Sequence, residues 1–173
     1  MIQSSRLGSL LLSALFALPF LAEPLLPGSL RAAEEKKIEF PAVSQHAVVK
    51  QRVGLTDIEV DYSRPNKNNR DIFGGLVPYG KLWRTGANAV TKIKFSKQVM
   101  LGGKEIPAGE YALFTIPTAD EWTIIISKEA KVQSAADYKQ ENDAARITAK
   151  PEPIPDTIET FTIGLRDQCL RVA

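Results

Sequence analysis

The sequence predicts an all-β fold, an antiparallel β-sandwich or flattened barrel of about 7–8 short strands with a long Gly-rich crossover loop. Apolar and polar residues alternate with period two in several segments, which is the pattern of a half-buried strand. Turn signals recur at intervals of roughly 8–12 residues, as they do in all-β domains. No segment carries the apolar spacing of a long amphipathic helix.

The chain begins with the layout of a secretory signal peptide. Arg6 precedes an apolar run over residues 7–22, which Pro24 helps to end, and small residues follow at Ala33. The run is short and interrupted, which favours a cleaved signal over an uncleaved membrane anchor. We therefore expect residues 1–32 to be removed, leaving a periplasmic or extracellular protein without a stable membrane span.

The composition excludes several classes of function. The formal net charge is only +2, so there is no global basic field to hold nucleic acid. The single histidine, His46, rules out a multi-histidine metal site, and the single cysteine, Cys169, cannot form an intrachain disulfide. We therefore expect no metal and no cofactor.

The mature chain is expected to open with a polar lead-in over residues 33–46, followed by one β domain over residues 47–165. The first strand, residues 47–53, places Val49 and its alternate neighbours on one face. The second, residues 56–62, places its apolar and acidic residues on opposite faces. Gly54 marks the turn of a predicted hairpin between them.

The later part of the chain is also expected to form short strands connected by turns. A strand is expected over residues 91–96, with Ile93 and Phe95 pointing inward, and turns follow near Gly102 and Gly109. Three consecutive isoleucines in residues 121–127 predict a strand that is buried on both faces. The further expected elements are a strand at 110–116, a loop with one helical turn at 131–143, and strands at 145–149 and 157–165.

Several long motifs resemble those of the bacterial domain-of-unknown-function family 2911, which occurs mostly in exported proteins. YSRP is followed by R-x-IFGGLVPYGKLWRTGAN, and then by PAGEYALFTIP and EWTIII. The resemblance runs from about Val49 to about Leu165 and implies no particular chemistry, because the family's activity is unassigned. It implies that these residues belong to the family's signature: Tyr62, Ser63, Arg64, Pro65, Arg70, Gly74, Gly75, Pro78, Tyr79, Gly80, Trp83, Arg84, Thr85, Gly86, Ala87 and Asn88.

The end of the chain departs from this resemblance, which implies at least one more alternating strand. Residues 166–173 alternate poorly, so we expect an atypical, truncated tail that cannot replace that strand. An open strand edge would result, with self-association or pairing to a partner strand as its consequence.

Residues 72–91 differ most from the rest of the chain, and we call them the signature segment. Guanidinium groups bind anionic groups in bidentate fashion, aromatic rings offer stacking faces, and glycines allow close backbone approach. This density of residue types predicts a ligand site, in or beside the segment, that comprises Arg64, Arg70, Tyr79, Lys81, Trp83, Arg84 and Asn88.

Three functions remain open on the sequence. The leading one is a non-catalytic binding module for a polar or anionic small molecule or a glycan. The second is a metal-independent hydrolase or isomerase, in which a carboxylate of Asp61, Asp71 or Glu110 acts with an arginine clamp. The third is a structural or protein-interaction domain, in which Trp83 fills the core and Arg84 ties the loop to carbonyl groups or to Asp61.

Known catalytic motifs do not fit. GLVPYGK lacks the spacing of a phosphate-binding loop, and Ser63 lacks the flanking glycines of a nucleophile elbow. His46 has no neighbour at metal-ligand spacing. No catalytic residue is therefore predicted.

Overall fold

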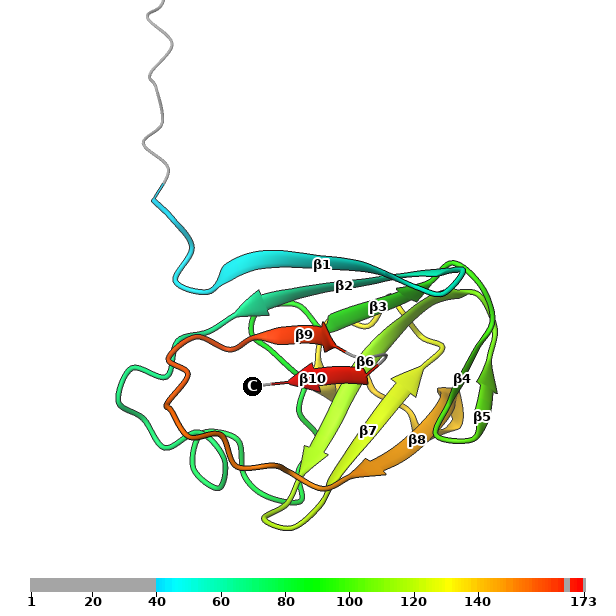
Figure 1. Ribbon diagram of the computed structural model, residues 1–173. Helices are drawn as coiled ribbons and strands as arrows, with labels where there is room; N and C mark the ends of the chain where they lie inside the picture. The colour runs from blue at the N-terminus through cyan, green and yellow to red at the C-terminus, as the bar shows by residue number, and fades with distance from the viewer. Residues whose placement is uncertain (1–39, 167–168, 173) are drawn as a thin grey trace, which may run out of the picture. The chain divides into compact units, whose positions relative to one another are not determined.

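A computed structural model describes residues 40–166 and 169–172 of the chain (Figure 1). Six strands form one sheet in the spatial order β1, β2, β3, β6, β7, β8, and all neighbours in it are antiparallel. Its strands are β1 (Gln45–Val53), β2 (Thr56–Arg64), β3 (Thr91–Phe95), β6 (Gly109–Pro117), β7 (Trp122–Ser127) and β8 (Asp143–Ala149). The predicted all-β fold class is confirmed.

The first hairpin forms where the alternation predicts it. Val53 pairs with Thr56, which leaves Gly54 and Leu55 to make the turn. Gly54 has a φ of 58°, a left-handed conformation that costs glycine little because it has no side chain. Val49 pairs with Val60, so the apolar sides of both strands lie on the same face of the sheet.

That face, which we call the inner face, carries the main hydrophobic core. Val60, Ile93, Leu113 and Ile126 contribute to it from four neighbouring strands, and all four are buried. Burying an aliphatic side chain of this size contributes about 1.5–3 kcal/mol. Alternate apolar residues in β2, β3, β6 and β7 therefore assemble one continuous core.

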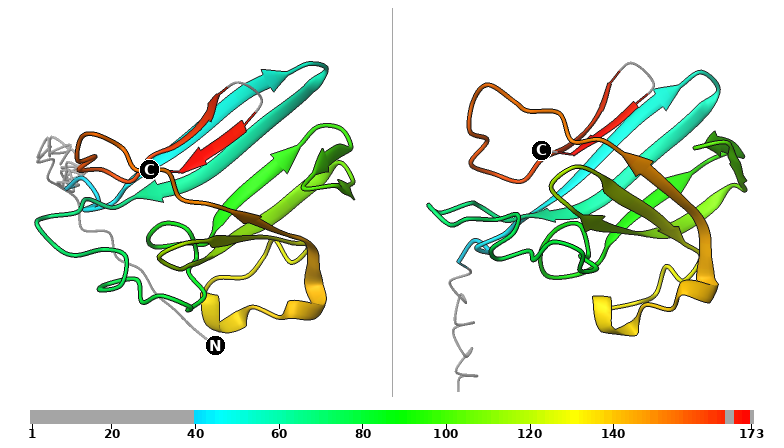
Figure 2. Two further views of the ribbon diagram at one scale, coloured as in Figure 1. Left: turned by 60° about the horizontal axis from the view of Figure 1, so that its bottom comes forward. Right: turned by 90° about the horizontal axis from the view of Figure 1, so that it is seen from below.

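Two small hairpins cover the inner face. One consists of β4 (Val99–Leu101) and β5 (Lys104–Ile106), and the other of β9 (Ile163–Arg166) and β10 (Cys169–Val172). Ile106 and Ile163 enter the core from these hairpins. Figure 2 shows the β9–β10 hairpin running beside the β1–β2 end of the sheet.

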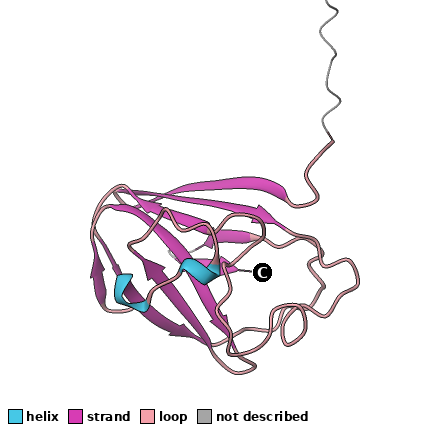
Figure 3. Cartoon of the chain, turned by 180° about the vertical axis from the view of Figure 1, so that it is seen from behind, coloured by secondary structure: helices cyan, strands magenta, loops and turns pink. Residues whose placement is uncertain are grey.

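The opposite face, which we call the outer face, is divided in two. Phe114 and Ile125 are buried in a second apolar cluster, against which Val132 and Tyr138 pack. The covering segment contains two short 3-10 turns, η1 (Ala135–Asp137) and η2 (Gln140–Asn142), drawn in cyan in Figure 3. Over β1, β2 and β3 the outer face is charged instead.

Most predicted elements are confirmed, including burial of β7 on both faces, where Ile126 enters one cluster and Ile125 the other. The predicted strand over residues 157–165 is too long, since β9 begins only at Ile163. Before it, Thr160 makes a single bridge to Asn66, which holds this stretch against the loop after β2.

The tail also differs from expectation. Cys169–Val172 form strand β10, which pairs in register with β9. The expectation that this segment makes a poor strand is therefore wrong, because its backbone needs only a partner and finds one in β9.

The predicted signal peptide, residues 1–32, lies outside the described residues. Among the residues that the structure describes, no helix has the length and apolar character that crossing a bilayer requires.

Candidate functional site

The signature segment is fastened to the sheet by its backbone. Trp83 N–H donates to the Thr115 carbonyl at 2.7 Å, and Thr115 N–H donates back to the Trp83 carbonyl at 2.9 Å. This bridge places Trp83 beside β6, beyond the last pair that β3 makes with that strand. The segment thus continues the sheet and holds the side chain of Trp83 in a fixed position.

Four aromatic side chains meet at this place, and we call Phe73, Trp83, Trp122 and Phe161 the aromatic cluster. The ring centroids of Phe73 and Trp122 are 4.7 Å apart, and those of Trp83 and Phe161 are 5.2 Å apart. The rings meet edge to face, the arrangement that their quadrupoles favour. The cluster joins the signature segment to the start of β7 and to the stretch before β9.

The cluster reaches solvent through the signature segment. Phe73 is 41% exposed, and Leu76 and Tyr79 nearby in the chain are 59% and 47% exposed. The turn beneath them is tight, since Gly74 N–H donates to the Val77 carbonyl at 2.9 Å. A Cβ at Gly74 would lie 2.8 Å from the Tyr79 ring, so only glycine lets that ring pack against the turn.

Arg64 links β2 to the same place. Its Nε donates to the Phe161 carbonyl at 3.2 Å, and its Nη2 donates to Thr162 Oγ1 at 3.1 Å. The guanidinium therefore lies against the backbone of a residue whose ring belongs to the aromatic cluster. Of the predicted site residues, Arg64 and Trp83 are the two that the structure brings to Phe161.

Arg70 holds the loop after β2. Its Nε donates to the Lys67 carbonyl at 3.0 Å, and its Nη2 donates to the Asn66 carbonyl at 2.7 Å. Lys81 is exposed, and in the described part of the chain it makes no ion pair. These two predicted site residues carry positive charge at the surface.

Arg84 and Asn88 form a second, separate group. Arg84 Nη1 donates to the Asn88 carbonyl at 2.8 Å. Leu82 packs in the outer-face cluster with Val90, whereas the next residue, Trp83, faces Phe161. The seven predicted site residues therefore do not form one constellation.

The three candidate carboxylates are also dispersed. On the outer face, Asp61 Oδ1 lies 2.7 Å from His46 Nε2, and Glu110 Oε1 lies 3.3 Å from Lys92 Nζ. Asp71 is exposed in the loop after β2. Among the described residues, none of the three forms an ion pair or a side-chain hydrogen bond with an arginine of the predicted site, and Arg84 donates to a carbonyl group.

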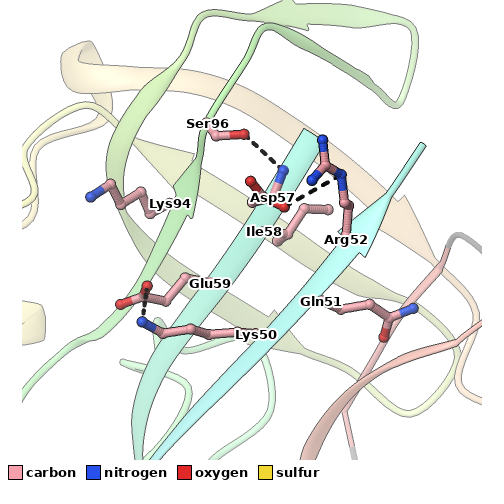
Figure 4. A pocket seen from close by; sticks show the side chains of 8 residues that line it. All are labelled: Lys50, Gln51, Arg52, Asp57, Ile58, Glu59, Lys94 and Ser96. Carbon is pink, nitrogen blue, oxygen red and sulfur yellow. Dashed lines mark hydrogen bonds and ion pairs between the residues drawn. The ribbon is translucent and has the colours of Figure 1, made fainter. Parts of the chain in front are cut away.

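A cavity of about 370 Å³ lies over the charged part of the outer face (Figure 4). The register of the strands places side chains of alternating charge next to one another across this cavity, from Lys50 to Glu59 to Lys94. Lys50 Nζ lies 2.9 Å from Glu59 Oε2, and this hydrogen bond lowers the pKa of the Glu59 carboxyl. Arg52 is paired with Asp57 at 3.8 Å. The charged side chains of neighbouring strands thus neutralise one another, as expected for a solvated sheet face.

A polar network that the sequence analysis missed lies at β8. Tyr138 Oη donates to Asp143, and Arg146 Nε donates to Asp143 Oδ2 at 2.6 Å. Burial raises the pKa of the Tyr138 phenol, and the hydrogen bond to Asp143 raises the pKa of Arg146. The network fastens the segment that carries η1 and η2 to the sheet.

A second cavity, of about 430 Å³, lies along the segment that carries η1 and η2, between Glu129 and Asn142.

Phe73, Trp122 and Phe161 were also missed as site residues. Their only signal in the sequence is their aromatic character, which core packing explains equally well: Phe73 lies in the signature segment, and Trp122 and Phe161 lie within expected strands. Within residues 40–166 and 169–172, no three His, Cys, Asp or Glu side chains lie where they could hold a metal ion.

Comparison with known proteins gives one positive result. No curated protein and no solved structure is significantly similar to this chain. One family does match over residues 44–171, which is most of the chain and includes the signature segment and the first part of β10. That family is described as a protein of unknown function (DUF2911).

Proposed function

The chain belongs to the DUF2911 family, and we propose that it is a non-catalytic binding module that holds a glycan or another polar small molecule on the aromatic cluster. Sugar rings stack their apolar C–H faces on aromatic side chains, while their hydroxyl groups bond polar neighbours. Tyr79 lies in the same exposed turn as Phe73, and Arg64 places a guanidinium against the backbone of Phe161.

One observation carries the proposal. Phe73 is 41% exposed, although its ring is packed edge to face against both tryptophans. A large aromatic side chain that remains in water loses part of the burial free energy that a core position would provide. A solvent-facing ring held at a fixed angle is instead suited to stacking on a ligand.

The dispersed carboxylates argue against the enzyme alternative. General acid or base catalysis needs a carboxylate within hydrogen-bond reach of the substrate, usually beside the groups that bind it. Asp61 and Glu110 are paired with cations on the outer face, whereas Phe161 of the aromatic cluster packs against the core of the inner face. Asp71 lies in the exposed turn with Leu76, but among the described residues no hydrogen bond or ion pair orients its carboxylate. Binding without catalysis therefore fits the geometry better.

A protein-interaction surface is the second candidate. Leu76 is 59% exposed between Phe73 and Tyr79, and an aliphatic side chain adds nothing to sugar stacking. Exposed apolar groups beside aromatic residues are typical of the centre of a protein–protein interface.

The test is a glycan array followed by calorimetric titration with any glycan that binds. Phe73→Ala and Tyr79→Ala should each weaken binding by roughly 10-fold or more, which corresponds to the loss of about 1–3 kcal/mol of stacking. Leu55→Ala removes an even more exposed apolar side chain, from the β1–β2 turn, and should leave affinity unchanged. Equal losses in all three variants would contradict the assignment. Retention of a protein partner by Leu55→Ala but not by Leu76→Ala would favour the second candidate.

The proposed compartment is the periplasm or the cell exterior. The apolar run over residues 7–22 and the small residues at Ala32 and Ala33 support export with cleavage. N-terminal sequencing of the protein made in its own cells should begin close to Ala33. A full-length product in the cytosol would contradict this part of the proposal.

A further inference from the structure

The loop formed by residues 84–88 has properties that the proposed binding surface does not use. We propose that this loop, together with the guanidinium of Arg84, binds an oxyanion, the phosphate, sulfate or carboxylate group of a small molecule. The site is separate from the aromatic cluster, and it does not depend on glycan binding.

The backbone of the loop is held in an unfavourable conformation. Thr85 has a φ of 55°, in the left-handed region that β-branched residues avoid, and Asn88 has a φ of 57°. Thr91 Oγ1 donates to the Thr85 carbonyl at 2.6 Å, and Thr85 Oγ1 lies 3.1 Å from Thr115 Oγ1. Such strain persists only where surrounding contacts fix it, and it concentrates at functional sites.

Gly86 fixes the loop from the other side. A Cβ at this position would lie 3.1 Å from both the Ser63 carbonyl oxygen and Thr91 Oγ1. The main chain of Gly86 therefore packs directly against β2 and β3, and no other residue fits without displacing them. The shape of the loop is set before any ligand arrives.

Among the described residues, the amide groups of the loop find no acceptors. Within the described ranges, no N–H group from Thr85 to Val90 donates a hydrogen bond. Thr85 and Gly86 are buried, where a donor without an acceptor is uncommon, while Ala87 and Asn88 reach the surface. Successive N–H groups in a tight turn form a concavity that attracts anions.

Arg84 supplies the charge. Its Nη1 donates to the Asn88 carbonyl, and among the described residues its Nε and Nη2 make no hydrogen bond and no carboxylate pairs with it. The side chain is half-buried, and a partly desolvated guanidinium is stabilised by a counter-charge. Its remaining fork matches the paired oxygens of an oxyanion.

The test is an NMR titration of the isotope-labelled, full-length chain with sodium phosphate at constant ionic strength. We expect saturable shifts of the amide signals of residues 85–89. Arg84→Met should weaken phosphate binding roughly 10- to 100-fold, since it removes a charge-assisted hydrogen bond. Lys97→Met removes one positive charge from an exposed turn and should leave the affinity unchanged.

Two further measurements keep the result decisive. Arg84→Lys keeps the charge but loses the planar fork, so an affinity between those of the parent and Arg84→Met is expected, while matching thermal unfolding would show that all variants are folded. Parallel titrations with sulfate and acetate distinguish tetrahedral from planar oxyanions as the preferred group. Absence of saturable shifts for all three anions would overturn the proposal, as would equal phosphate affinity in Arg84→Met and Lys97→Met. Neither outcome bears on the aromatic cluster, which the glycan titration tests separately.

Discussion

At the scale of single residues, the three arginines of the predicted site act first on the main chain. Arg64 and Arg70 each direct a guanidinium at carbonyl oxygens of neighbouring loops, and Arg84 does the same within its own loop. A guanidinium has five donors in a fixed plane, so one arginine can fix a loop and still present donors outward. Structural and ligand-binding roles for these side chains are therefore compatible.

Glycine substitutions separate close packing from backbone freedom. Gly80→Ala should cost about 1–2 kcal/mol, because φ is 71° there but no atom lies within 4 Å of the new Cβ. Gly86→Ala should cost about 1–3 kcal/mol more, because its Cβ also meets β2 and β3 at 3.1 Å. Urea unfolding measures both free energies. Equal losses in the two variants would show that the 84–88 loop is not packed as described.

At the scale of elements, the β9–β10 hairpin is part of the core and not an appendage. Ile163 is 1% exposed, and its backbone N–H donates to Tyr62 Oη at 3.1 Å. Arg64 holds the two residues just before it. The late part of the chain thus closes the inner face over β2.

Truncation of Ile163 measures this contribution. Ile163→Ala should destabilise the protein by about 2–5 kcal/mol, the usual cost of a cavity in a packed core. Ile158→Ala lies in the preceding loop, where the side chain is 44% exposed, and should change stability by no more than about 0.5 kcal/mol. A small loss for Ile163→Ala in thermal and urea unfolding would mean that the hairpin does not close the core.

The Tyr138 network predicts a loss of stability at alkaline pH. Because burial raises the folded-state pKa of Tyr138 above its value in the unfolded chain, the folded state retains the proton that the unfolded state releases. This contribution is complete below the unfolded pKa, near 10, and disappears as pH rises through the folded pKa. Tyr138→Phe should flatten the decline between about pH 9 and 11 relative to Tyr79→Phe, which changes an exposed side chain outside the network. Identical pH profiles for the two variants would contradict the assignment.

Local patterns predicted elements well and long-range contacts poorly. The period-two alternation of β2 and the three isoleucines of β7 determine which side chains enter each cluster. The aromatic cluster links Phe73 to Phe161 through Trp83, and no local pattern in the sequence reveals such distant contacts. The strand β10 depends likewise on its pairing with β9, which alternation within residues 166–173 does not reveal.

At the scale of the whole molecule, charged residues are distributed unevenly between the strands, although the net charge of the chain is small. The chain carries 22 basic and 20 acidic residues, yet β1 contains Lys50 and Arg52 and no acidic residue. In the described part of the chain β1 is an edge of the main sheet, with β2 as its only partner there. Charged side chains at an edge oppose pairing with a second copy.

Self-association through a strand edge stays a prediction, and this charge pattern makes it dependent on salt. Two β1 edges would bring like charges together, which dilute salt screens weakly and concentrated salt screens strongly. We expect a monomer in sedimentation velocity at low ionic strength and, if the edges pair, a dimer only at high ionic strength. Lys50→Glu should permit pairing at lower salt, whereas Lys104→Glu on β5 should not. A dimer that is independent of salt would argue for another contact.

The most direct test of the proposed binding module uses its tryptophans. The chain has only two, Trp83 and Trp122, and both belong to the aromatic cluster. Their indole N–H signals in a proton–nitrogen NMR spectrum therefore report on this surface alone. With a glycan identified on the array, we predict that both indole signals shift saturably with the affinity measured by calorimetry, while the amides of Lys50 and Glu59 on the outer face stay fixed. Binding that shifts the outer-face amides and leaves both indole signals in place would contradict the account.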